Sequence, residues 1–138
     1  MTLYANTDGA SRGNPGESGI GIILRDERGT VVYSGSGYIG RTTNNAAEYQ
    51  ALLACLKKAL QLGCSKLIVR SDSELMVRQL QGEYRVKDKN LQRYHTEATR
   101  LIKSAPFAVE VVHVERGKNG DADLLANAGI DGRRKLKV

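Results

Sequence analysis

The chain has 138 residues, of which 41% are hydrophobic and 26% charged, and its formal net charge is +6. These values are typical of one soluble globular domain, and the positive charge favours an anionic partner, above all nucleic acid. No run of 18 apolar residues is present, which excludes a transmembrane helix. The first five residues lack a basic and apolar leader, so we expect a cytoplasmic protein.

The hydrophobic pattern predicts a regular alternation of strands and helices. We expect strands over residues 2–7, 19–26, 30–39, 66–70 and 109–114, and helices over 45–62, 73–80, 90–103 and 121–128. The short turn at 27–29 implies an antiparallel hairpin. Three strands in a meander, followed by strand–helix–strand crossovers, predict an α/β fold with a mixed sheet and helices on its faces. Residues 1–138 are expected to form one domain, with a frayed basic tail from about residue 131.

Four carboxylates fall at junctions between the expected elements. Asp8 follows the first strand and opens a glycine-rich loop at 9–16, and Asp72 follows the strand at 66–70. Glu48 and Asp123 fall in the first turns of helices. Because a parallel arrangement brings such junctions to one edge of a sheet, we expect the four acids to lie close together.

Each acid also has an ordinary structural explanation. Asp8 can cap a turn, and Asp72 can cap the helix that follows it. Asn45 and Glu48 nearly form a capping box, and a first-turn acid such as Asp123 is favoured by the helix dipole. The joint pattern favours chemistry, because four neighbouring carboxylates repel one another unless a cation offsets their charge. Oxygen ligands suit Mg²⁺ or Mn²⁺, and two such ions can promote hydrolysis of a phosphodiester.

Four motifs then carry a resemblance to a known family. They are Thr7-Asp8-Gly9-Ala10-Ser11 with Gly13-Asn14-Pro15-Gly16, Thr43-Asn44-Asn45-Ala46-Ala47-Glu48, Ser71-Asp72-Ser73, and Ala122-Asp123-Leu124-Leu125-Ala126-Asn127-Ala128. In this order and at these spacings the chain resembles type 1 ribonuclease H over nearly its whole length. The resemblance implies a ribonuclease H-like fold, with a five-stranded mixed sheet flanked by helices. It also implies a monomeric endonuclease that cuts RNA in RNA/DNA hybrids and leaves 5′-phosphate and 3′-hydroxyl ends.

The resemblance further implies roles for individual residues. Asp8 would bridge two metal ions, Mg²⁺ or Mn²⁺. Asp123 would help to hold the ion that activates water, and Glu48 and Asp72 the ion at the leaving group. The implied substrate contacts are Gly9, Arg12, Gly13, Asn14, Thr43, Asn44, Asn45, Glu74, Lys87 and Asn90.

Several of these substrate contacts depart from the family pattern. Relatives often carry glutamine at the position of Glu74. Thr43 would bind a DNA phosphate, but its usual asparagine partner is Asp88 here, so Asn90 either replaces it or caps a helix. Lys87 belongs to a basic segment, 83–89, that is expected to contact phosphates without sequence preference.

The chain resembles a short form of the family. The segment 83–89 stands where well-known bacterial relatives carry a basic protrusion with tryptophans, and this chain has no Trp. The loop at 116–120 lacks the histidine of those relatives. His113 precedes that loop and is expected to be structural, because strand alternation places it on one face with Val109 and Val111. His95 is expected to be a surface or packing residue.

Three other functions compete with this interpretation. A non-cleaving hybrid-binding module would have lost a carboxylate, and all four are present. A phosphatase with an aspartyl nucleophile would need Asp-x-Asp after the first strand, whereas this chain has Asn6-Thr7-Asp8. A resolvase or transposase relative would share the fold but not the strings around Glu48 and Asp123.

Overall fold

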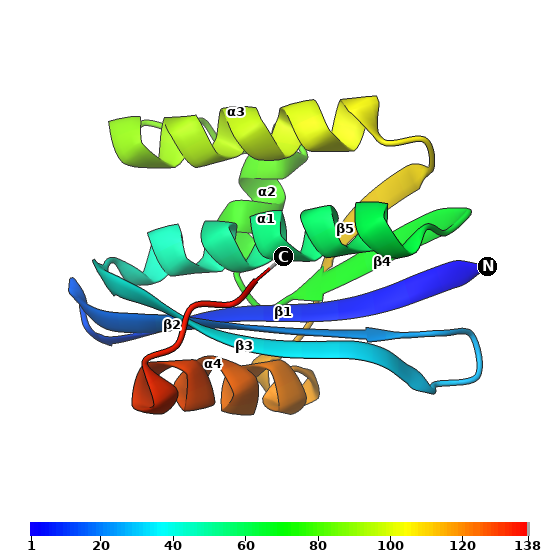
Figure 1. Ribbon diagram of the computed structural model, residues 1–138. Helices are drawn as coiled ribbons and strands as arrows, with labels where there is room; N and C mark the ends of the chain where they lie inside the picture. The colour runs from blue at the N-terminus through cyan, green and yellow to red at the C-terminus, as the bar shows by residue number, and fades with distance from the viewer. Residues whose placement is uncertain (138) are drawn as a thin grey trace.

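The structure, a computed structural model that describes residues 1–137, has one sheet with helices on both faces. Its elements are β1 (Thr2–Gly13), β2 (Gly16–Arg25), β3 (Val31–Thr42), α1 (Asn44–Leu62), β4 (Lys66–Ser71), α2 (Glu74–Leu80), α3 (Lys89–Ser104), β5 (Ala108–His113), η1 (Arg116–Lys118) and α4 (Gly120–Gly132). The strand order is β3-β2-β1-β4-β5 (Figure 1). The first three strands are antiparallel, and β4 and β5 run parallel to β1, which confirms the predicted five-stranded mixed sheet.

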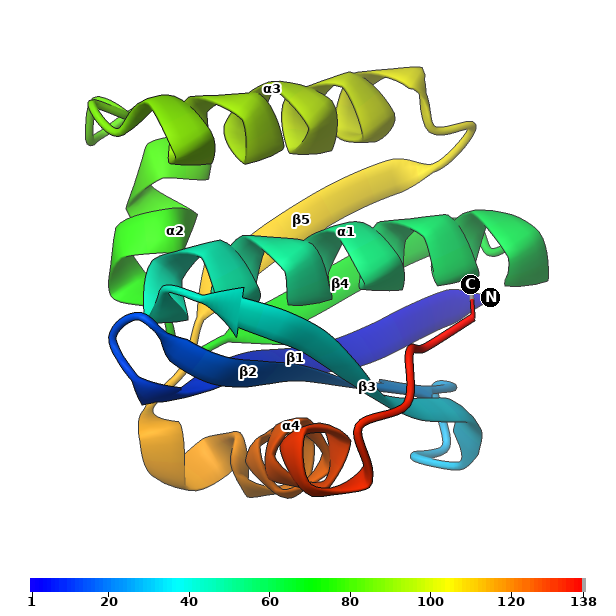
Figure 2. The same cartoon turned by 60° about the vertical axis from the view of Figure 1, so that its left-hand side comes forward.

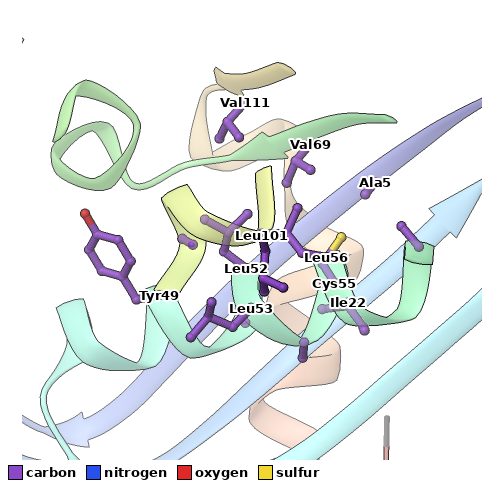
Figure 3. Packing of buried hydrophobic residues seen from close by; sticks show 14 of the residues in the cluster. Ala5, Ile22, Tyr49, Leu52, Leu53, Cys55, Leu56, Val69, Leu101 and Val111 are labelled. Carbon is purple, nitrogen blue, oxygen red and sulfur yellow. The ribbon is translucent and has the colours of Figure 1, made fainter. Parts of the chain in front are cut away.

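The core lies between the sheet and α1. Leu3 and Ala5 of β1 pair with Leu67 and Val69 of β4, and all four side chains are fully buried on the same face. On this face α1 contributes a row of leucines together with Cys55, and Figure 3 shows them packed against β1, β4 and α3. The apolar contacts fix α1 above β1, and therefore fix where its first turn meets the sheet.

α4 covers the opposite face, over β2, β3 and β1 (Figure 2). Glycines in β2 permit this close approach, because a Cβ at Gly19 or Gly21 would overlap backbone oxygens of α4. Gly129 allows the same contact from the helix side, where a Cβ would overlap the carbonyl oxygen of Gly37. Among residues 1–137, no helix has both the length and the apolar character needed to cross a membrane.

The ends of several elements differ from the sequence prediction, most clearly those of β1 and α4. β1 does not end at residue 7 but continues to Gly13, because residues 8–13 pair antiparallel with β2 up to Gly16. The expected glycine-rich loop is therefore strand and hairpin turn. The last helix extends beyond residue 128 to Gly132, so Asp131 and Gly132 are helical rather than frayed.

The residues after α4 pack against the edge strand β3. The N–H of Tyr38 donates to the carbonyl oxygen of Arg134 at 2.8 Å. Leu136 is partly buried against the core and lies over Gly35 and Gly37, where any Cβ would crowd it. As far as Leu136 the segment therefore packs against β3, in contrast to the expected frayed tail, and Val138 lies outside the described residues. Figure 2 shows this segment passing from α4 around β3 towards α1.

The packing of Leu136 predicts a contribution to stability. Leu136→Ala should lower the free energy of unfolding by about 1–2 kcal/mol, since a partly buried leucine contributes less than the ~2–5 kcal/mol of a fully buried one. Urea denaturation measures the change, and Lys137→Ala, at an exposed neighbour, serves as the matched control. Equal stabilities of the two variants would show that this segment does not hold the edge strand.

Candidate active site

The first two carboxylates are brought together by the end of a parallel ladder. β1 and β4 pair from Thr2 and Lys66 to Thr7 and Ser71, and the pairing stops there. Asp8 and Asp72 are the next residue in each chain, so their backbones leave the last pair side by side. β1 then continues with β2, whereas the chain after Asp72 turns into α2. Ser73, rather than Asp72, caps α2 by accepting from the N–H of Met76, so the capping explanation for Asp72 is wrong.

Glu48 enters from the first turns of α1. The N-cap is Thr43, whose hydroxyl accepts from the N–H of Ala46, so the capping-box explanation for Asn45 and Glu48 is wrong. Glu48 instead accepts a hydrogen bond of 2.7 Å from the backbone N–H of Gly9. Gly9 permits this approach, because a Cβ there would overlap the backbone of Ala47. The glycine next to Asp8 thus holds a second carboxylate beside it.

Asp8, Glu48 and Asp72 each place one carboxylate oxygen within 4.8 Å of the others. Asp123, in the first turn of α4, lines the same open cavity of about 520 Å³. Asn119 anchors the start of α4 to β1, because its buried side chain donates to the carbonyl oxygen of Thr7 at 2.9 Å. All four predicted acids therefore meet in one cavity, from four different elements.

The electrostatics of the cavity is dominated by burial and by repulsion between the acids. Burial first, and then the charge of Asp72 and the nearby Asp123 carboxyl, raise the pKa of Asp8 to about 8. Burial and the charge of Asp8 also raise the pKa of Glu48 well above its usual range, and the N–H of Gly9 opposes that rise. Such a cluster of oxygen donors favours a hard divalent cation, which relieves the repulsion that raises these pKa values.

Arg116 is a cavity residue that sequence reasoning missed. It lies in η1, just after β5, and within residues 1–137 it is the one basic residue that lines the cavity of the four acids. Its charge opposes the rise in the pKa of Asp8. The signal was the strand order: β5 pairs parallel with β4, so the residues that follow it reach the same edge of the sheet. Asn127 of α4 also lines the cavity and was missed.

Some of the predicted substrate contacts line the cavity. They are Gly9, Asn44, Asn45 and Glu74. Glu74 is held by Arg78, one helical turn further along α2, at 3.3 Å. Asn14 lies outside this lining but is tied to it, since its side-chain oxygen accepts from the N–H of Asn44 at 3.1 Å.

The other predicted contacts have partners elsewhere or lie away from the acids. Arg12 forms an ion pair of 2.6 Å with Asp131 of α4, which raises its pKa through their hydrogen bond. Asp88 caps α3 by accepting from the N–H of Leu91, so Asn90 is not the cap; it accepts instead from the Arg93 side chain. Three further residues, Gly13, Thr43 and Lys87, are exposed and do not line the cavity.

Neither histidine lies among the four acids. His113 is exposed at the end of β5 and lines a separate hollow against α2, with Glu74 and Arg78. Strand alternation places it on the face of Val111, as predicted, but the core does not extend that far, so it is not packed. His95 is partly buried on α3, and its Nε2 lies 3.2 Å from the carbonyl oxygen of Gln79.

Sequence similarity relates the chain to known proteins. It matches the family model described as reverse transcriptase-like over residues 6–129. It is 40% identical to a ribonuclease HI of Halobacterium salinarum over 129 residues, 94% of this chain and 64% of that protein. It is 38% identical to the bifunctional protein Rv2228c of Mycobacterium tuberculosis, over 95% of this chain and 36% of that protein. The chain thus spans less than two thirds of the length of these curated relatives.

Two solved structures are similar over nearly their full length. The crystal structure of RNase H1 from Halobacterium salinarum NRC-1 has a TM-score of 0.91 at 39% identity, covering 96% of this chain and 99% of that chain. The structure of LC11-RNase H1 in complex with an RNA/DNA hybrid has a TM-score of 0.90 at 40% identity, covering 94% and 97%.

The raised pKa of Asp8 predicts how stability depends on pH. In the metal-free protein, Asp8 titrates at about 8, whereas its ordinary value is 3.8. Between these values the folded state binds the extra proton, so stability falls as pH rises. Asp8→Asn removes this term and should raise the free energy of unfolding at pH 7 by at least about 1 kcal/mol.

The measurement is urea unfolding in EDTA at pH 5 and pH 7.5. Glu115→Gln, which neutralises an exposed acid next to η1, should leave the pH dependence of the wild type unchanged. Parallel pH curves for Asp8→Asn and the wild type would contradict the raised pKa.

Proposed function

Because the chain belongs to the type 1 ribonuclease H family, we propose that it hydrolyses the RNA strand of RNA/DNA hybrids. The proposed reaction is endonucleolytic and leaves 5′-phosphate and 3′-hydroxyl ends. The similarity to LC11-RNase H1, whose structure contains an RNA/DNA hybrid, supports this substrate. The observation that carries the proposal is the meeting of Asp8, Glu48, Asp72 and Asp123 in one open cavity.

The residues of the cavity fit divalent metal ions. Three carboxylates already offer oxygens within 4.8 Å of one another. Burial and then the neighbouring Asp72 and Asp123 carboxyls raise the pKa of Asp8, and a cation would offset the charge of these neighbours. Mg²⁺ and Mn²⁺ prefer such ligands and keep several waters, which suits an open cavity. Two ions, when bound, would supply a nucleophile at neutral pH and stabilise the leaving oxygen.

The chain's own residues would hold these ions and place the substrate. Asp8 is the proposed ligand that both ions would share, Asp123 would help to hold one ion, and Glu48 and Asp72 would help to hold the other. The hydrogen bond from Gly9 leaves the second oxygen of Glu48 free for an ion. Asn44 and Asn45 carry both donors and acceptors at the cavity rim, as recognition of RNA 2′-hydroxyls requires.

The rival functions fit the cavity less well. A binding module without cleavage has no need for four carboxylates whose repulsion costs stability, as the raised pKa of Asp8 implies. An aspartyl phosphatase would need a second acid two residues before Asp8, where Asn6 instead donates to Asn119 at 3.0 Å.

A duplex comparison tests the proposed function. With Mg²⁺ or Mn²⁺, the wild type should cut the RNA of an RNA/DNA hybrid and leave a matched DNA/DNA duplex intact, because DNA lacks the 2′-hydroxyl. Asp8→Asn should fold but lose at least about a hundredfold in turnover, since metal assistance contributes several kcal/mol. An RNA/RNA duplex completes the set. Hybrid cleavage by Asp8→Asn at the wild-type rate would contradict the four-carboxylate site.

Arg116 is the proposed partner of the scissile phosphate. A phosphodiester entering the cavity meets four acids and this one guanidinium. Guanidinium groups bind phosphate through two parallel hydrogen bonds, and charge that develops in the transition state strengthens such bonds. Arg116 lies in the loop where well-known bacterial relatives carry a histidine. We propose that it acts through its charge rather than by proton transfer.

Replacing Arg116 tests this role. Arg116→Ala should lower kcat about tenfold or more, because one lost donor to a developing charge typically costs this much or more. Arg116→Lys should recover part of the rate, since charge remains without the paired donors. Lys118→Ala removes a charge from the same loop but outside the cavity of the acids, and should leave kcat unchanged. Equal losses of kcat in Arg116→Ala and Lys118→Ala would contradict this role and would indicate that Arg116 only attracts nucleic acid through its charge.

A further inference from the structure

A buried polar contact links α1, the helix that carries Glu48, to α2, the helix that follows Asp72. The hydroxyl of Tyr49 donates to the side-chain oxygen of Gln79 at 2.6 Å. Tyr49 is fully buried and Gln79 is 5% exposed. Tyr49 is the residue after Glu48 on α1, and Gln79 lies on α2, the short helix that begins directly after Asp72 and Ser73. Figure 3 shows the ring of Tyr49 with its hydroxyl turned towards α2.

This contact is directional, whereas the apolar contacts of α2 are not. α2 is anchored in the core by Met76 and Val77, which are almost fully buried, and it touches α1 over only a short stretch. Apolar contacts tolerate small rotations and shifts of a helix, whereas a hydrogen bond of 2.6 Å fixes both a distance and an angle. Burial raises the pKa of Tyr49 well above 10, so its hydroxyl remains a donor at neutral pH.

The other end of Gln79 is fixed as well. Its main-chain carbonyl oxygen lies 3.2 Å from Nε2 of His95 on α3 and accepts a hydrogen bond of 3.2 Å from the N–H of Gly82. Gln79 thus joins α1, α2 and α3 at one buried point. A leucine and a phenylalanine could fill the same space at little cost in stability, since replacing both partners of a buried hydrogen bond by apolar groups is often nearly neutral. A buried, hydrogen-bonded pair instead specifies one relative placement of the helices.

We propose that the Tyr49–Gln79 hydrogen bond positions Glu48 and Asp72 relative to each other. Tyr49 and Gln79 are positioning residues, because neither lines the cavity of the acids. They act through the helices: one bond holds the helix that carries Glu48 against the helix that follows Asp72 and Ser73. The inference rests on the proposed function only in taking these acids as ligands of a divalent ion.

The chain offers a matched control for this bond. Tyr94 of α3 accepts a hydrogen bond of 3.2 Å from the side chain of Gln50, the next residue along α1. Tyr94→Phe therefore removes a tyrosine hydroxyl that contacts the same region of α1, but Tyr94 lies on α3, which carries none of the four acids. A change that follows from loss of a tyrosine hydroxyl beside α1 would appear in both variants.

The test is the affinity for Mn²⁺ without substrate, measured from the paramagnetic resonance signal of the free ion. Tyr49→Phe should raise the dissociation constant about tenfold, as removal of groups that orient metal ligands typically does. Tyr94→Phe should change it less than twofold. With hybrid present, Tyr49→Phe should lose kcat at limiting metal and recover it at excess metal, with KM for the hybrid unchanged.

A double-mutant cycle tests whether Tyr49 and Gln79 act through the hydrogen bond that joins them. Gln79→Met removes the acceptor and should raise the Mn²⁺ dissociation constant as much as Tyr49→Phe does. The double variant should then be no worse than either single variant. Circular dichroism checks that each variant folds. If Tyr49→Phe does not fold, the Mn²⁺ affinity of Gln79→Met alone tests the inference. Effects that add, or an unchanged Mn²⁺ affinity in the folded variants, would overturn the inference. A wild type that binds no Mn²⁺ and cuts no hybrid would instead overturn the proposed function.

Discussion

The candidate site depends on the point where β1 and β4 stop pairing. The parallel ladder ends at Thr7 and Ser71, so the next residues, Asp8 in β1 and Asp72 after β4, start out as neighbours. Everything else at the site is arranged around that pair. The buried face of α1 fixes this helix above β1 and so places Glu48 at the site. α4 places Asp123 there, because Asn119 at its start donates a hydrogen bond to the carbonyl oxygen of Thr7.

The same arrangement costs stability, and the surrounding structure offsets that cost. Burial and mutual repulsion raise the pKa of Asp8 and of Glu48, so charging both is unfavourable in the folded state. The N–H of Gly9 opposes the effect at Glu48, and Arg116 opposes it at Asp8. The core beneath α1 is one continuous cluster of buried apolar side chains, and their burial offsets this cost. Such a cluster is retained where charge is needed for function rather than for folding.

Much of the fold could be predicted from sequence, because hydrophobic periodicity identifies strands and helices locally. The meeting of the four acids could also be predicted, since it follows from which junctions a parallel sheet brings together. The ends of elements could not. Residues 8–13 have the composition of a loop, and only pairing with β2 makes them a strand. Gly129 resembles a helix stop, yet it is the point where α4 packs closely on Gly37 of β3.

Side-chain roles were harder to predict than positions. The sequence suggests that Asn45 caps α1 with Glu48, whereas Thr43 is the cap, and Glu48 reaches across to Gly9 instead of back to its own helix. Arg12 has the charge of a substrate contact but pairs with Asp131, a residue more than one hundred positions away in the chain. These outcomes depend on tertiary neighbours that no local pattern contains. His113 shows the reverse: alternation gave its face correctly, but not where the core ends.

The charge distribution poses one further requirement. The chain carries a net charge of +6, which attracts a polyanion at long range, yet the cavity it would enter is lined by carboxylates. An approaching nucleic acid is therefore first attracted by the net positive charge and then repelled by the carboxylates of the cavity. Only groups inside the cavity can reverse the local sign, and the described residues there supply one guanidinium, that of Arg116, against four acids and Glu74. A phosphate can be accommodated beside Asp8 only if cations make up the difference, so on these electrostatics substrate binding and metal binding should be mutually dependent.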